Sequence, residues 1–157
     1  MNIRIPLALT IIVLLLFTLI GCGGGPPTTL GDIPTYTGAT ELKPGESAVA
    51  DMLVQNMEQN KALTGQIGVN ATVEQKAFTV PADATWDDVK KFYDEKLTGS
   101  GWSSNSIMSN VMAQANVGND QFQIANWQKG KQNLSVIMIA DPTGDNTKML
   151  ITSLASS

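Results

Sequence analysis

The sequence has no histidine and a single cysteine, Cys22, among its 157 residues. Histidine is the commonest general base and the commonest metal ligand in proteins. Without it, and with one thiol, zinc sites, Cys–His and Ser–His–Asp nucleophile arrangements and an internal disulfide are excluded. The P-loop, dinucleotide-binding and G-x-S-x-G motifs are absent too. We therefore expect no metal, no cofactor and no enzymatic activity.

Positive charge is also scarce. Ten lysine and arginine residues stand against fourteen acidic ones, and the only arginine, Arg4, lies near the amino terminus. No stretch of the chain forms a basic patch, so we expect no nucleic-acid partner.

Carboxylate chemistry of the glycosidase kind is the one catalytic class that these absences leave open. The adjacent acidic pairs are Asp87 with Asp88 and Asp94 with Glu95. Neighbouring helix residues point about 100° apart, so such pairs do not converge on one substrate. We interpret both pairs as parts of a solvated helix face.

Residues 1–21 have the organisation of a signal peptide. Arg4 gives a short positive start, and the apolar run over 5–20 is shorter than the roughly 20 residues of a membrane span. The sequence Leu19-Ile20-Gly21-Cys22 resembles the bacterial lipobox, with an aliphatic residue at −3 and a small residue before the cysteine. This resemblance implies cleavage before Cys22 and attachment of acyl chains to it, which hold the protein on the outer face of a bacterial membrane, either an outer membrane or a cell membrane.

Composition divides the rest of the chain into two parts. Residues 22–34 hold the lipidated cysteine and a tether rich in glycine and proline. Residues 35–157 are long enough for one domain with a two-layer core.

Apolar periodicity predicts two helices and several strands in that domain. The helices are expected over 48–63 and from Trp86 to the glycines at 99 and 101, with Thr85 as the N-cap. Strands are expected over 70–80, from Trp102, and over 121–128, 134–140 and 149–154, with turns at Gly130 and over 141–146. The order helix, strand, helix, meander predicts an α+β fold with both helices packed on one face of a mainly antiparallel sheet.

Four short features of the domain follow a pattern. They are Tyr36-Thr37-Gly38-Ala39, Phe92-Tyr93, Leu97 and Gly101-Trp102. Together they resemble a group of uncharacterised bacterial lipoproteins with a Y-P-G-A entry, an F-Y helix, a leucine and a G-W pair. Thr37 stands where that group usually has proline. The resemblance spans most of the domain and implies a small extracytoplasmic α+β domain, with no catalytic residues to carry over.

Two regions are candidates for a partner or ligand surface. Trp127 is in phase with Ala125 and Gln123, opposite Phe122 and Ile124, so we expect it to be half exposed. The stretch 103–120 fits a short helix or a strand with a long loop, and it carries an apolar stripe made of Ile107, Met108, Val111 and Met112.

Three functions are compatible with these features. The first is a membrane-anchored lipoprotein whose non-catalytic domain binds a protein partner or serves as an accessory subunit of a membrane complex. The second is binding of a small ligand or glycan in an aromatic cleft that includes Trp127. The third is a carboxylate-based hydrolase, which requires two carboxylates roughly 5–10 Å apart in one cleft.

The lipobox gives a direct prediction. Replacing the acylated thiol in Cys22→Ser should leave an uncleaved precursor with no acyl label, measured by metabolic labelling with palmitate. Normal labelling of the Cys22→Ser chain would refute the lipobox interpretation.

Overall fold

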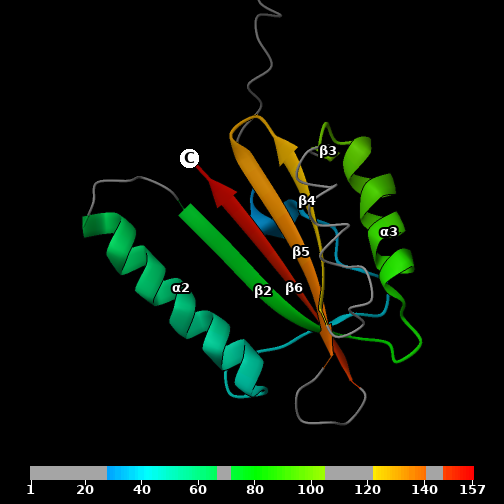
Figure 1. Ribbon diagram of the computed structural model, residues 1–157, viewed down its shortest axis with the longest axis horizontal. Coiled ribbons are helices and arrows are strands. Elements are labelled where there is room, and N and C mark those ends of the chain that lie inside the picture. Colours follow the sequence, from blue (N-terminus) through cyan, green and yellow to red (C-terminus); the bar gives the residue numbers. More distant parts are fainter. Residues whose placement is uncertain (1–27, 67–71, 105–121, 141–146) are drawn as a thin grey trace, which may run out of the picture.

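The computed structural model describes residues 28–66, 72–104, 122–140 and 147–157 (Figure 1). In chain order its elements are η1 (Leu30–Asp32), β1 (Thr40–Glu41), α2 (Ala48–Gln66), β2 (Thr72–Val80), α3 (Trp86–Thr98), β3 (Ser103–Ser104), β4 (Phe122–Lys129), β5 (Gln132–Ala140) and β6 (Lys148–Ser156). No helix in these ranges has both the length and the apolar character needed to cross a membrane.

Within these ranges the strands form one antiparallel sheet of six, in the order β1-β2-β6-β5-β4-β3. The consecutive strands β4, β5 and β6 make the predicted meander. β6 then lies between β5 and β2 and pairs with both along its full length. The predicted α+β class, with two helices and an antiparallel sheet, is confirmed.

The two helices lie on opposite faces of the sheet, so the expectation that both pack on one face is wrong (Figure 1). Leu150 of β6 packs in one buried cluster with Tyr93 of α3. The flanking Met149 and Ile151 pack in a second cluster with Val49 of α2. Because successive side chains of a strand point to opposite faces, a strand that is apolar at every position needs a cover on each side.

The helix α3 begins and ends as the sequence predicts. The side chain of Thr85 accepts a hydrogen bond from the backbone N–H of Asp88 at 3.2 Å, and Asp87 and Asp88 place negative charge in the first turn. Val89, Tyr93 and Leu97 are fully buried. Their helical spacing puts these three side chains on one face of α3, which packs on the sheet.

The helix α2 is held less tightly. Ser47 caps it, since its hydroxyl oxygen accepts a hydrogen bond from the N–H of Val49 at 3.1 Å. Val49 and Leu53 pack toward the sheet, but the neighbouring Met52 is 53% exposed. α2 thus covers its face of the sheet through a narrow contact.

Trp127 lies in the core with 2% of its surface exposed, so the expectation of a half-exposed side chain is wrong. Its Nε1 donates a hydrogen bond to Oδ1 of Asp94 at 2.9 Å, and its ring packs beside Tyr93. The alternation along β4 is as predicted, but the buried face is the one with Ala125 and Trp127. On the other face, Phe122 is 41% exposed.

This hydrogen bond joins α3 to β4, and its loss should destabilise the fold. We expect Trp127→Phe to lower the free energy of unfolding by about 2 kcal/mol, because it removes core volume and a hydrogen bond to a carboxylate. Urea unfolding followed by circular dichroism measures this loss. Trp86→Phe, at a half-buried position, is the control and should cost clearly less. Equal losses in the two variants would contradict this account of Trp127.

Candidate functional site

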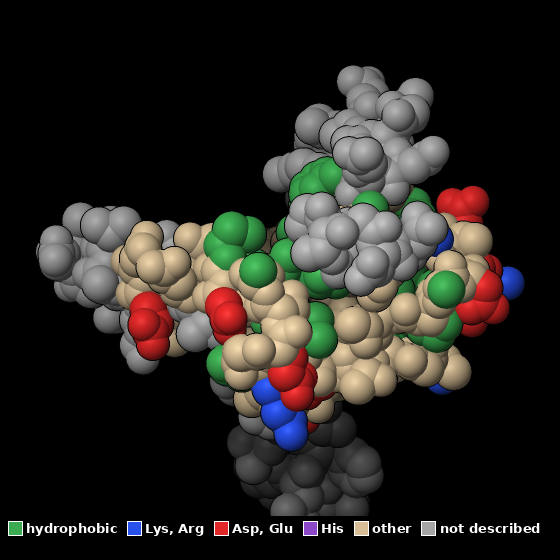
Figure 2. Space-filling view, turned by 90° about the horizontal axis from the view of Figure 1, so that it is seen from below, with side chains coloured by type: hydrophobic (Ala, Val, Ile, Leu, Met, Phe, Trp, Pro, Cys, Tyr) green, Lys and Arg blue, Asp and Glu red, His purple; other side chains and the backbone are tan. Residues whose placement is uncertain are grey.

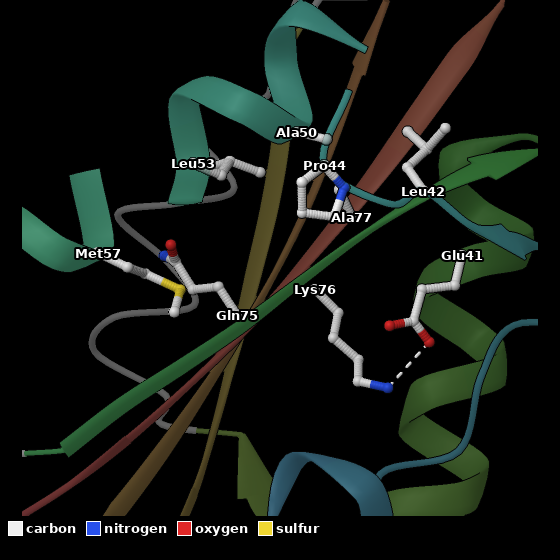
Figure 3. Close-up of a pocket in the computed structure, with 9 residues that line it drawn as sticks. All are labelled: Glu41, Leu42, Pro44, Ala50, Leu53, Met57, Gln75, Lys76 and Ala77. Carbon is white, nitrogen blue, oxygen red and sulfur yellow. Dashed lines mark hydrogen bonds and ion pairs between the residues drawn. The ribbon is translucent and has the colours of Figure 1, made fainter. Parts of the chain in front are cut away.

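A shallow groove lies between α2 and the strands β1 and β2 (Figure 3). Its volume is about 140 Å³. Met57 projects from α2 toward the side chain of Gln75 of β2, and Leu53 and Ala77 also line the groove (Figure 3). The remaining lining residues are Glu41, Leu42, Pro44, Ala50 and Lys76. We call this feature the α2–β2 groove.

A tight turn over 43–46 places α2 beside β1. The N–H of Glu46 donates to the carbonyl of Lys43 at 3.0 Å, and Gly45 has a φ of 89°, a conformation that favours glycine. The N–H of Gly45 then donates to Oδ1 of Asp51 at 2.6 Å, within the first turn of α2. These bonds turn the chain from β1 directly into α2, so the groove forms where the two elements diverge.

The rim of the groove carries one ion pair. Nζ of Lys76 lies 2.9 Å from Oε2 of Glu41, and the two side chains are 38% and 50% exposed. Such a surface pair contributes little to stability and is screened by salt. Glu41 is the only carboxylate among the residues that line the groove, so the arrangement of two converging carboxylates that a glycosidase needs is not built there.

The other acidic side chains of interest are engaged elsewhere. Asp88 bonds to the cap residue Thr85, and Asp94 accepts from Trp127 and pairs with Lys90. Figure 2, which views the molecule from below, shows acidic side chains at separate spots on that face. In the described part of the chain, no three histidine, cysteine, aspartate or glutamate side chains come together to hold a metal ion.

The perturbed titratable groups lie away from the groove. Burial raises the pKa of the Tyr93 hydroxyl well above its ordinary value. Hydrogen bonds from the backbone N–H and the hydroxyl of Thr29 lower the pKa of Asp32. Tyr93 lies in the core and Asp32 closes η1, so neither shift indicates an acid or a base beside the groove.

Next to the groove, the outer edge of β2 is paired over only part of its length. β1 pairs with Phe78 and Thr79, and the N–H of Leu42 donates to the carbonyl of Ala77 at 2.8 Å. Among the described residues, no strand lies outside positions 72–76 of β2. This part of β2 is therefore an open sheet edge.

The register shows which backbone groups the open edge offers. Backbone N–H and C=O groups alternate in direction along an antiparallel strand. Since the carbonyl of Ala77 points outward to Leu42, the groups of Gln75 and Val73 point outward as well. The side chains of these two residues lie on the α2 face of the sheet, and Val73 is 42% exposed.

The sequence-predicted surface residues divide into two groups. Cys22 lies outside the described residues, and so do Ile107, Met108, Val111 and Met112. Of the stretch 103–120, only Ser103–Ser104 is described, as the strand β3. Trp127 is described and lies in the core. The open edge of β2 and the α2–β2 groove were not anticipated, because sequence pattern shows which residues form a strand but not which strand becomes the edge.

Fold and groove together define a small α+β domain with an antiparallel sheet between two helices, and with a part of β2 beside an apolar groove that no described strand covers. No protein-family model matches the chain, and no curated protein or solved structure matches it either. The resemblance to lipoproteins with the Y-P-G-A entry stays a prediction.

Proposed function

We propose that this protein is an acyl-anchored lipoprotein on the outer face of a bacterial membrane, and that its non-catalytic domain binds a partner protein. An extended segment of the partner adds to the open edge of β2, and its side chains enter the α2–β2 groove. The observation that carries this proposal is that no described strand pairs with the outer edge of β2 at positions 72–76, beside a largely apolar groove.

Strand addition fits this edge for two reasons. Main-chain hydrogen bonds to an open sheet edge supply affinity, while pockets for alternate side chains supply specificity. Here Val73 and Gln75 offer outward N–H and C=O groups, and Leu53 and Met57 line the adjacent groove with flexible apolar surface. The partner segment that fits is extended and carries an apolar residue at every second position.

Binding of a small ligand or glycan in an aromatic cleft has less support. The groove volume of about 140 Å³ is well below the roughly 300–1,000 Å³ of ordinary ligand sites. No aromatic side chain lines the groove, and Trp127 is buried in the core. A bound strand needs no deep pocket, because most of its hydrogen bonds go to the sheet edge.

The backbone donor of Val73 provides the sharpest test. Proline has no N–H, and it is tolerated on a strand edge that faces solvent. Val73→Pro should therefore leave the sheet intact while it removes the donor that a partner strand would use. We expect the affinity for the partner, and with it the recovery with the tagged protein, to fall about five- to thirtyfold, since a hydrogen bond lost in a desolvated interface costs about 1–2 kcal/mol.

The measurement is affinity purification of the tagged protein from native membranes, with partners quantified by mass spectrometry. Val73→Thr is the matched control, because it changes the side chain and keeps the N–H. Thermal unfolding of both variants checks that the domain remains folded. Full recovery of the partner with a folded Val73→Pro chain would rule out strand addition at this edge.

A further inference from the structure

The first described residue, Thr28, is fixed to the sheet by one buried side chain. Oε1 of Gln132 accepts a hydrogen bond from the N–H of Thr28 at 2.9 Å, and its Nε2 donates to the carbonyl of Thr28 at 2.7 Å. The same Nε2 donates to Oγ of Ser156 at 2.9 Å. Gln132 is 7% exposed, so it binds the backbone of Thr28 from within the sheet and fixes where the preceding chain leaves the domain.

A second set of contacts holds the next residues at the same place. The N–H of Leu30 donates to Oε2 of Glu74 at 3.0 Å, and the side chain of Leu30 is buried. Asp32 accepts from the N–H of Thr29 at 2.8 Å. The chain is therefore attached firmly to the domain from Thr28 onward.

This attachment lies at one end of the sheet. Ser156 pairs with Gln132 on one side and with Thr72 on the other, and Gln132 pairs with Lys129 across the turn between β4 and β5. Figure 1 shows that this turn and the carboxyl end of β6 lie at the same end of the molecule. We call it the hairpin end, made of Thr28, residues 129–132, Ser156 and Thr72.

The covalent chain limits how far the hairpin end is from an anchor at Cys22. Six residue steps separate Cys22 from Thr28 in the sequence, which span at most about 20 Å when fully extended. A flexible chain of this length covers only about 14 Å on average. A nine-residue strand such as β5 is about 30 Å long, so the tether is shorter than the domain.

The hairpin end presents lysines that suit lipid phosphates. Lys129 and Lys131 flank the turn, and Lys96 lies in the last turn of α3. The carboxylates nearest to the tether, Asp32 and Glu74, already accept hydrogen bonds from backbone N–H groups. Nζ of Lys129 donates to Oγ1 of Thr28 at 3.4 Å, whereas Lys131 and Lys96 are exposed. Lys131 is therefore the cation of the turn that can meet an anionic surface.

We propose that the hairpin end of the domain faces the lipid bilayer, with Lys131 at the headgroup phosphates. This inference rests on the acyl anchor at Cys22 that the proposed function includes. The open part of β2 starts at Thr72, at the same end. A partner that adds to β2 must therefore present its extended segment close to the bilayer.

Fluorescence quenching by labelled lipids tests this orientation. Acylation occupies the thiol of Cys22, so one introduced cysteine is the only free thiol of the mature protein. Ser157→Cys places a fluorophore beside Ser156 at the hairpin end and keeps the lysines, and Asp83→Cys places it beyond β2 at the opposite end; both positions are exposed. The acylated protein is reconstituted in phosphatidylcholine–phosphatidylglycerol vesicles with or without a headgroup nitroxide.

We expect quenching of the Ser157→Cys probe to exceed that of the Asp83→Cys probe severalfold. Equal quenching, or stronger quenching at position 83, in protein that floats with the vesicles would overturn the orientation and leave the proposed anchor standing. Protein that does not float with the vesicles would overturn the anchor and this inference with it.

A lengthened tether is the matched control. About 20 glycine and serine residues inserted between Pro27 and Thr28 raise the average reach to roughly 28 Å, comparable to the length of the domain. The difference between the two probes should then shrink. An undiminished difference would contradict the role of tether length in the proposal.

Discussion

The rest of the structure depends on β5 and β6, which carry apolar side chains on both faces of the sheet. Leu134, Val136, Leu150 and Leu154 fill one face of the sheet, while Met149 and Ile151 fill the other. A strand with apolar side chains on both faces is stable only between two covers. α3 covers one face with an extensive buried stripe, and α2 covers the other through a narrow contact. Because the contact of α2 with the sheet is narrow, the α2–β2 groove remains open beside β2.

The same constraint explains why the open edge lies where it does. β6 is the last strand, yet it lies between β2 and β5 and pairs with both along its length. β2 is thereby left outside β6, and β1 is too short to cover it. Natural sheets usually protect such edges against chance pairing. An edge that stays open beside an apolar groove is the feature expected of a domain that receives a strand from a partner.

Much of this fold was predictable from the sequence, and the failures have identifiable causes. Local signals identified α3 through its cap at Thr85, and alternation identified the meander. Alternation separates the two faces of a strand but does not show which face is buried. The half-exposed Trp127 that it predicted therefore lies in the core instead. The position of α2 and the open edge depend on strand order, which arises from contacts between distant residues. The α2–β2 groove results from that strand order as well, so local sequence pattern could not predict it.

The central claim is that a partner strand pairs with the outer edge of β2. Hydrogen–deuterium exchange of individual β2 amides, in the protein alone and bound to its copurified partner, tests this most directly. The account predicts that the outward amides of Val73 and Gln75 exchange fast alone and become protected in the complex. The inward amides of Glu74 and Lys76, which face β6, should be protected in both states. Unchanged fast exchange at Val73 and Gln75 in the complex would contradict the account.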